Sequence, residues 1–350
     1  MKEIELKISF NTPAFLGNAE QQGQWRTPPF KALLRQWWRV VKARKLNYDH
    51  RELKKKEDQL FGFAADESKG SSQKSELLLR LDTWKDSTDN VIDTGIPVKH
   101  PEVKDRPCGA NLYLGFGPVS YRSEQTKRSI PVDENAILSL RFPDEFEKEI
   151  AETIQLIDWF GTIGSRSRNA WGSINLEALS GIEFKPFSLS SVQKYARNWQ
   201  EALNTDWAHC IGEDSNGLLL WETKDKRSAW EEAIRDLAEI KIAFRTDMKF
   251  SDGKYAPLEE RHVIAYPVTN HFVNGVPKNL RNANQIRFKV CKTSDGKFFA
   301  RIFHMPCTVD KAFKDQFNPR EYCNFENTAW PKVHKVLDQK CKRLREEKHS

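Results

Sequence analysis

Apolar and polar residues alternate at the start of the chain, over positions 4 to 10. A period of two is typical of a strand with one buried face. Further on, Thr27 followed by Pro28 predicts the N-cap and the first position of a helix. Apolar residues then recur every three or four positions, so we expect this helix to cover about residues 29–45.

Similar patterns continue through the first half of the chain. They indicate an amphipathic helix at 144–160 and strands near 77–81, 112–116, 137–142 and 173–179. The order strand, helix, strands, helix, strand is that of a ferredoxin-like (split βαβ) domain. We therefore predict an α+β fold in which a first ferredoxin-like domain covers residues 1–182. A long insertion rich in charges and turn formers occupies residues 84–110.

The second half gives weaker patterns. Residues 183–191, with Pro186 and several serines, predict a linker. After it we expect helices near 190–204, 226–240 and 326–346, and strands near 217–221, 262–266, 285–291 and 297–304. These elements suggest a second, degenerate ferredoxin-like domain at residues 192–350, in tandem with the first and ending in a charged helix.

Composition narrows the class of protein. A length of 350 residues favours two domains. No apolar run approaches the roughly 20 residues that cross a bilayer, and the first residues lack the apolar stretch of a signal peptide. None of the six cysteines forms a C-x-x-C pair, which argues against a zinc ribbon or a redox motif. We therefore expect a cytoplasmic protein with no membrane association, no metal and no cofactor.

Basic residues are concentrated in two segments. The whole chain has a formal charge of +7. From Arg26 to Lys56 there are eleven Lys and Arg residues against two acids, a net charge of +9. From Lys278 to Arg301 there are seven against one, a net charge of +6. Two concentrated basic segments in a nearly balanced chain suggest surfaces that face a polyanion.

The first predicted helix carries a basic stripe. Its members lie at offsets of four, eight and eleven and fall within roughly 80° of one another on the helix: they are Lys31, Arg35, Arg39 and Lys42. No acid stands four residues after any of them, so salt bridges within the helix do not explain the stripe. A phosphate backbone explains it, and a solvated charged face is the alternative.

The loop before this helix offers groups that read single-stranded RNA. Asn18 supplies an amide, Trp25 an aromatic plane and Arg26 a cation. The amino-terminal end of the helix adds partial positive charge on the same side. The alternative is that this loop contacts a neighbouring protein.

A glycine-rich run extends from Gly161 to Gly172. Glycines allow tight turns and close approach of a ligand to the backbone. The run is not a Walker motif, because no Gly-Lys-Ser/Thr closes it, and it follows a helix and leads into a strand, which is the wrong order for a dinucleotide fingerprint. A purely structural turn is the alternative. The RNA-binding candidates here are Gly164, Ser165, Arg166 and Arg168, and the second basic segment adds Arg281 and Arg287.

These motifs together resemble the RAMP superfamily of CRISPR proteins. The resemblance rests on the glycine-rich run and on Thr12-Pro13, Trp37-Trp38-Arg39 and Leu60-Phe61-Gly62. The Trp-Trp-Arg helix and the Ile-Gly-Ser-Arg-Ser-Arg loop are most similar to the first subunit of the Cmr (type III-B) effector complex. The resemblance covers much of the first 175 residues and is thinner beyond residue 185.

The resemblance implies two ferredoxin-like domains and a role in antiviral defence. It implies a place near the end of the complex, where the subunit holds the 3′ portion of the guide (CRISPR) RNA and the incoming single-stranded target RNA. It also implies that the partners include other Cmr-complex subunits, especially neighbouring RAMP subunits. We therefore expect a non-catalytic RNA-binding subunit.

The alternative function is a RAMP-superfamily ribonuclease that cleaves guide precursor or target RNA. Relatives of this kind use a histidine, or a loop aspartate with metal assistance. The eight histidines here are scattered, and His50 and His100 are examples that join no recognisable site. The loop after the first strand offers Glu20 and no aspartate, although Asp105 in the insertion is a possible substitute.

Overall fold

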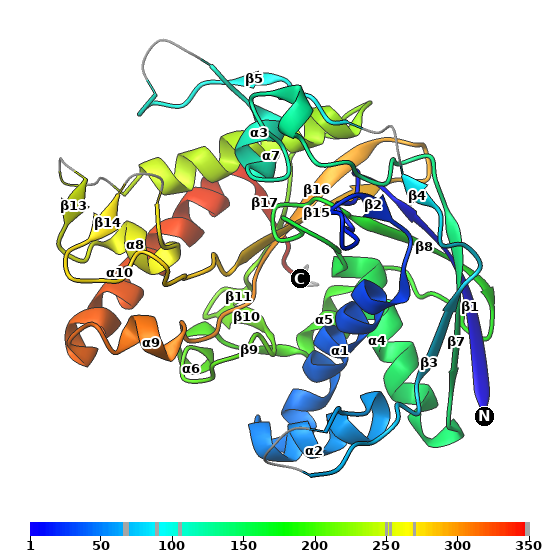
Figure 1. The fold of residues 1–350 in the computed structure, drawn as a ribbon. Helices are drawn as coiled ribbons and strands as arrows, with labels where there is room; N and C mark the ends of the chain where they lie inside the picture. The colour runs from blue at the N-terminus through cyan, green and yellow to red at the C-terminus, as the bar shows by residue number, and fades with distance from the viewer. Residues whose placement is uncertain are drawn as a thin grey trace.

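The computed structural model describes residues 1–65, 70–87, 91–103, 107–248, 251, 254–268 and 271–346. Within them the chain has a mixed α+β fold built around two four-stranded sheets, each with helices packed against it (Figure 1). The predicted α+β class is confirmed. No helix in the described ranges is long and apolar enough to cross a membrane.

The first sheet has the strand order β3-β7-β1-β8, and every neighbouring pair is antiparallel. The alternating start of the chain forms the inner strand β1, in which Leu6 lies opposite Leu138 on one neighbour and Ala178 on the other. The strands are β1 (Lys2–Phe10), β3 (Leu78–Leu81), β7 (Ala136–Phe142) and β8 (Ile174–Ser180). All four strands predicted from positions 4–10, 77–81, 137–142 and 173–179 are present.

Two long helices cover the first sheet and pack against each other (Figure 1). Their contact is aromatic: Trp37 stacks on Phe160 with ring centroids 5.7 Å apart, and both rings are buried. The helices of this half are α1 (Thr27–Ala43), η1 (Arg44–Leu46), α2 (His50–Phe61), η3 (Asp144–Phe146) and α4 (Glu147–Phe160).

The predicted N-cap at Thr27 is wrong by one residue. Arg26 is the N-cap, with extended backbone and no side-chain hydrogen bond to the helix, while Thr27 is already helical and proline follows in the first turn. Because Pro28 and Pro29 lack an N–H, the first turn has two fewer donors to satisfy, which lets α1 begin without a polar cap. The Arg26 side chain is therefore left for other contacts.

A short helix, which begins where the predicted insertion ends, replaces the strand that was predicted at 112–116. Ala110 and Leu114 share one face of this helix and pack with the core of the second half, whereas Leu112 packs near Trp171. A segment buried on both sides has no period that separates strand from helix. The elements here are β2 (Gly23–Gln24), β4 (Asp86–Ser87), β5 (Pro97–Val98), β6 (Cys108–Gly109), α3 (Ala110–Gly115) and η2 (Ser123–Gln125).

The second large sheet has the order β15-β16-β12-β17, again with antiparallel neighbours. Along the chain its elements run strand, helix, two strands, helix, strand, and the spatial order of the strands repeats that of the first sheet. The elements are β12 (Leu220–Glu222), α7 (Trp230–Thr246), β15 (Ile286–Lys292), β16 (Phe298–His304), α10 (Pro319–Lys340) and β17 (Lys342–Arg343).

Two other predictions in this half are wrong. The helix expected at 190–204 is interrupted by a strand that pairs in parallel with β10, a long-range contact that local periodicity does not encode. The strand expected at 262–266 is a helix that packs against α10. The remaining elements are α5 (Leu189–Gln193), β9 (Ala196–Asn198), α6 (Trp199–Ala202), β10 (Ile211–Asp214), β11 (Gly217–Leu218), β13 (Tyr255–Ala256), α8 (Glu260–Ile264), β14 (Phe272–Val273) and α9 (Lys311–Lys314).

The two halves share buried contacts. The Val290 N–H donates to the Ser173 hydroxyl at 2.9 Å, and the Asn11 amide donates to the Val290 carbonyl at 3.0 Å. The core around the first sheet also takes in Phe303 and Met305 from the second half. The glycine-rich run ends at this junction and is therefore held by both halves.

Candidate nucleic-acid interface

The glycine-rich run folds as a compact loop on the segment that follows β1. The Ser165 N–H donates to the Phe15 carbonyl at 3.1 Å, and the Gly172 N–H donates to the Pro13 carbonyl at 2.9 Å. The Thr12 hydroxyl donates to the Ala170 carbonyl at 2.5 Å. The loop is thus fixed against the Thr-Pro segment, and its exposed part from position 164 to 166 is presented on a rigid base.

Gly164 is required by the backbone. Its φ of +89° lies in the region that favours glycine, and an added Cβ would lie 2.7 Å from the Phe15 carbonyl oxygen. Close packing of this loop on the first strand's connection therefore depends on the absence of a side chain at position 164.

A hollow of about 310 Å³ opens between the two predicted RNA-binding loops. We call it the loop hollow. It brings together four of the predicted site residues, Asn18, Arg26, Gly164 and Ser165, and its full lining is Phe15, Leu16, Gly17, Asn18, Gln21, Arg26, Pro29, Lys127, Arg128, Gly164 and Ser165. Asn18 also closes its own turn, since its side-chain oxygen accepts from the Gln22 N–H at 2.9 Å.

The loop hollow is positively charged. Arg26, Lys127 and Arg128 line it, and none of the described lining residues is acidic. Within the described part of the chain these three cations form no ion pair, and the Arg26 Nε is buried without a hydrogen-bond partner. Three cations with no acidic counterpart attract an anion.

Lys127 and Arg128 were not predicted as site residues. The backbone brings them to the hollow, because Ile130 pairs with Ala14 and the Lys127 N–H donates to the Pro118 carbonyl at 2.8 Å. The sequence did contain a signal for a basic surface here: two basic residues stand next to each other, and the ten residues before them include a single acid, Glu124.

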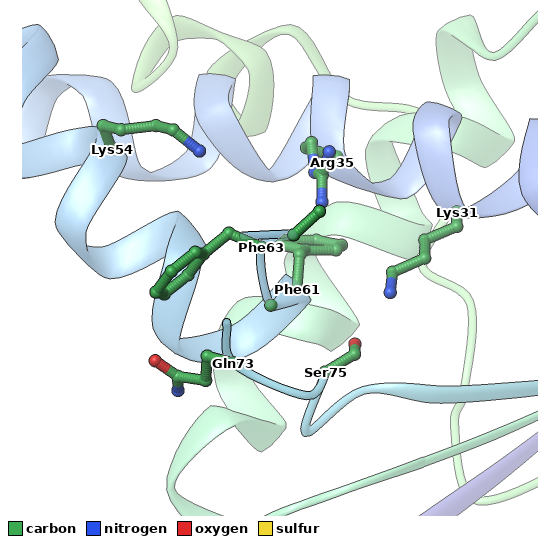
Figure 2. Close-up of a pocket in the computed structure, with 9 residues that line it drawn as sticks. Lys31, Arg35, Lys54, Phe61, Phe63, Gln73 and Ser75 are labelled. Carbon is green, nitrogen blue, oxygen red and sulfur yellow. The ribbon is translucent and has the colours of Figure 1, made fainter. Parts of the chain in front are cut away.

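A second hollow, of about 530 Å³, lies beside the first turns of α1. We call it the helix hollow. Figure 2 shows Lys31 and Arg35 on α1 facing the end of α2 and the segment at Gln73 and Ser75, with Lys54 at the opposite rim. The Arg35 guanidinium lies 5.3 Å from the centre of the Phe61 ring. Burial and the neighbouring Arg35 lower the pKa of Lys31.

The basic stripe on α1 is divided by its acidic partners. Arg39 forms a bidentate ion pair with Glu57, whose side chain is only 2% exposed. The Arg35 Nε lies 3.5 Å from the same carboxylate. Lys42 pairs with Glu149 of α4. The acids come from α2 and α4 and not from α1 itself, so no salt bridge within the helix is involved, as the sequence indicated. The expectation that the whole stripe is free to face a phosphate backbone is wrong for these two cations. Arg39 and Lys42 are engaged within the protein.

Trp25 is a core residue. It is 1% exposed, its ring stacks on Phe10 and Phe30 with centroids 5.2 and 6.1 Å away, and its indole N–H donates to Glu134 at 3.1 Å. The prediction of Trp25 as a platform for a base is not supported by this geometry, because both the ring and its donor already have partners.

The remaining predicted arginines lie in three places. The Arg166 guanidinium approaches the turn at Gly117. Arg168 donates to the Asn284 carbonyl at 3.4 Å and lies near Arg287, and burial together with Arg168 lowers the pKa of Arg287 to about 9. Arg281 is exposed and donates to the Lys278 carbonyl at 2.7 Å. None of these four lines either hollow.

The residues considered for catalysis do not come together. Glu20 and His50 are exposed on separate elements, and Asp105 lies outside the described residues. His100, however, lies against Tyr113 with ring centroids 5.7 Å apart, a pairing that the sequence did not reveal. Burial lowers the pKa of His100. Within the described residues no group of three or more His, Cys, Asp or Glu side chains is placed to hold a metal ion.

A family model matches the first part of the chain. Residues 7–175, just under half of the sequence, match the model described as the RAMP superfamily. This match covers the same part of the chain as the motifs that resemble that superfamily. No curated protein sequence matches the chain.

Two solved structures share the fold over nearly the whole chain. One is Cmr1 from Pyrococcus furiosus in its apo form, with a TM-score of 0.51, 16% identity, and coverage of 93% of this chain and 95% of that one. The other is a chain of the type III-B Cmr-beta complex bound to cognate target RNA, with a TM-score of 0.50, 11% identity, and coverage of 95% and 100%. At these identities the likeness is one of fold.

Proposed function

We propose that this protein is a non-catalytic RNA-binding subunit of a CRISPR type III-B (Cmr) effector complex. In this role it holds the 3′ portion of the guide RNA, the incoming target RNA, or both, at the end of the complex, beside neighbouring RAMP subunits. It acts in the cytoplasm, where a reducing environment suits six free cysteines.

The loop hollow is the observation that carries this proposal. Its three cations have no acidic partner among the described residues, and they surround a glycine loop whose rigid backbone leaves positions 164 and 165 exposed. Phosphate groups of a nucleic acid supply the missing negative charge, and binding to single strands of RNA commonly uses such basic grooves. The match to the RAMP superfamily model and the fold shared with Cmr1 favour RNA as the polyanion.

We also propose that the chain consists of two ferredoxin-like domains, residues 1–182 and 192–350, the second of them degenerate. The repeated strand order in the two large sheets supports this division. The buried contacts between the halves argue that the two domains fold as a pair and move little relative to each other.

The test is affinity for labelled single-stranded RNA, measured with the full chain. Arg26→Glu combined with Arg128→Glu reverses two charges in the loop hollow and should weaken binding by more than tenfold. A matched control reverses two exposed lysines on α9 and α10, Lys311→Glu and Lys335→Glu, with the same change in net charge. The control should bind nearly as well as wild type.

Equal losses in the two double variants would mean that net charge, and not the loop hollow, determines affinity. Full affinity in the Arg26 and Arg128 variant would contradict the proposed site. Incorporation of each variant into a reconstituted complex then separates RNA contact from subunit contact, since a variant that assembles normally and binds RNA weakly has lost only the former.

A ribonuclease remains the second candidate, and one observation favours it. His100 lies beside Tyr113, and the Lys241 ammonium lies 5.8 Å from the centre of the same Tyr113 ring. A histidine, a phenol and an amine are groups that exchange protons in general acid–base catalysis. Cleavage of RNA by the wild-type chain that His100→Ala abolishes would favour this candidate.

A further inference from the structure

Two large aromatic side chains project into solvent beside the glycine-rich loop. Tyr121 is 75% exposed and Phe116 is 57% exposed, in a chain where most aromatic rings are buried. Both lie in the connection between α3 and β7, which also carries Lys127 and Arg128 of the loop hollow. Their exposure is not needed for folding, because an exposed ring adds no core contact.

The segment that carries these rings is held firmly. Val119, between them, is fully buried in the cluster around Trp171 of the glycine-rich loop. The backbone of Phe116 pairs with that of Val119 to close a turn, and the Ser120 N–H donates to the Thr126 hydroxyl at 3.0 Å. The backbone that carries the two rings is therefore tied to the core through Val119 and to its own turns through these hydrogen bonds.

Basic residues lie on the same connection as the two rings and against the turn beside Phe116. The Arg166 guanidinium packs on the turn at Gly117, directly after Phe116: a Cβ added at Gly117 would lie 3.3 Å from its Nη2 atom. Arg122 follows Tyr121, and the Lys127 N–H donates to the Pro118 carbonyl within the same turn region. Among residues 115–130 there are three basic side chains against one acid, Glu124, a net charge of +2.

From this arrangement we infer that Phe116 and Tyr121 are stacking platforms for unpaired bases of the RNA strand whose phosphates occupy the loop hollow. The inference rests on the proposed function and extends it from the backbone of the RNA to its bases. A flat aromatic face binds any base by stacking, so the platforms hold RNA without selecting its sequence. The adjacent cations neutralise the phosphates that connect the stacked nucleotides.

The charge around the rings favours RNA over a protein partner. A protein interface built on two exposed aromatic rings has a hydrophobic centre with few charges. Here the connection that carries the rings also carries Arg122, Lys127 and Arg128, and the last two of these line the loop hollow. Aromatic planes next to cations form the combination that binds single-stranded nucleic acid.

The test uses the full chain and single-stranded RNA oligonucleotides that contain 2-aminopurine, whose fluorescence falls when the base stacks. Wild type should quench the probe. Phe116→Ala with Tyr121→Ala should restore its fluorescence and weaken binding by roughly fivefold or more for each ring removed. The salt dependence of affinity should stay unchanged, because no phosphate contact is lost.

Two further variants make the result specific. Phe116→Leu with Tyr121→Leu keeps an apolar side chain but removes the rings, and it should lose quenching like the alanine variant. Tyr255→Ala removes an exposed ring (47%) on β13, away from both hollows, and it should behave like wild type. All variants should melt at the wild-type temperature, since the altered side chains are exposed.

The outcomes separate this inference from the proposed function. Wild-type affinity and quenching in the alanine variant would overturn the stacking platforms and leave RNA binding intact. Normal RNA binding combined with lost association with other complex subunits would identify a protein interface instead. A wild-type chain with no affinity for single-stranded RNA would overturn the proposed function and this inference with it.

Discussion

The structure predicts that only part of the basic surface contributes to the salt dependence of RNA binding. Replacing Arg26, Lys127 and Arg128 by alanine removes the three cations of the loop hollow that have no acidic partner among the described residues. Replacing Arg39 and Lys42 by alanine removes two cations that are already paired with Glu57 and Glu149. The first set should therefore lower the salt dependence of binding without loss of stability, whereas the second set should lower stability and leave the salt dependence unchanged.

The magnitude follows from counterion release. Each phosphate contact on a single strand contributes about 0.7 to the slope of log affinity against log salt. Loss of three contacts should lower the slope by about 2.1, so over a fourfold rise in salt the affinity of wild type should fall about 18 times more than that of the triple variant. The Arg39 and Lys42 variant should keep the wild-type slope to within about 0.3.

Stability should fall in the variant that lacks the paired cations and not in the variant that lacks the loop-hollow cations. Glu57 is 2% exposed and loses its two-bonded partner when Arg39 is removed, although Arg35 and Lys54 remain within 4 Å. We expect Arg39→Ala to lower the free energy of unfolding by about 2 kcal/mol. The triple variant of the loop hollow should be as stable as wild type or slightly more stable, because removing unpaired like charges relieves repulsion.

Binding curves at four salt concentrations and denaturant unfolding of each variant check both halves of this prediction. A wild-type slope in the triple variant would refute the loop hollow as the phosphate site. A reduced slope in the Arg39 and Lys42 variant, with stability unchanged, would show that these two ion pairs do not form in solution and that the whole stripe on α1 faces RNA.

Three other predictions concern single positions. Gly164→Val should lower the melting temperature, because position 164 has positive φ and the added Cβ would lie 2.7 Å from a carbonyl oxygen; the free energy of unfolding should fall by on the order of 2–3 kcal/mol. Gly217→Val, at a position with positive φ but open space around the added Cβ, should lower the free energy of unfolding by less. Burial raises the pKa of Glu326 to about 7, so the free energy of unfolding should fall as pH rises from about 4.5 to 7 and this carboxyl ionises in the unfolded chain first. Glu326→Gln should remove this pH dependence and, in chemical denaturation at pH 8, raise the free energy of unfolding by on the order of 2 kcal/mol. Glu321→Gln, which changes an exposed side chain, should do neither. The purified chain should not cleave labelled RNA with or without Mg²⁺ or Mn²⁺. The test includes alanine variants of Glu20, His50, His100 and Asp105, and cleavage by wild type that one of these variants abolishes would contradict the prediction.

Local patterns were sufficient for the regular elements that bury one face. Period two at positions 4–10 predicted β1, and helical spacing predicted α1 and α4, because a half-buried element carries its own periodicity in the sequence. Patterns failed for α3 and α8, where apolar residues are buried on more than one side and the period is lost. They also failed for β9, whose pairing with β10 joins separate segments.

The candidate site was predicted in outline only. The sequence identified the two loops that meet at the loop hollow, but it placed Trp25 on the surface although the ring is buried. It missed Lys127 and Arg128, whose approach to Asn18 depends on the pairing of Ala14 with Ile130 across more than a hundred residues. Which side chains are buried, and which distant segments pair, depends on how the elements pack, and local sequence patterns do not predict that packing.

By itself the sequence determined the α+β class, the main periodic elements, the resemblance to the RAMP superfamily, and the high density of basic residues near α1. Only the tertiary structure decided which of those cations are available to a ligand. The partners of Arg39 and Lys42 stand 18 and 107 residues away along the chain and reach them through the packing of α2 and α4 on α1. Electrostatic attraction depends on distance in space and not along the chain. The stripe has no ion pair within α1, but acids on the neighbouring helices pair with some of its cations and leave others unpaired.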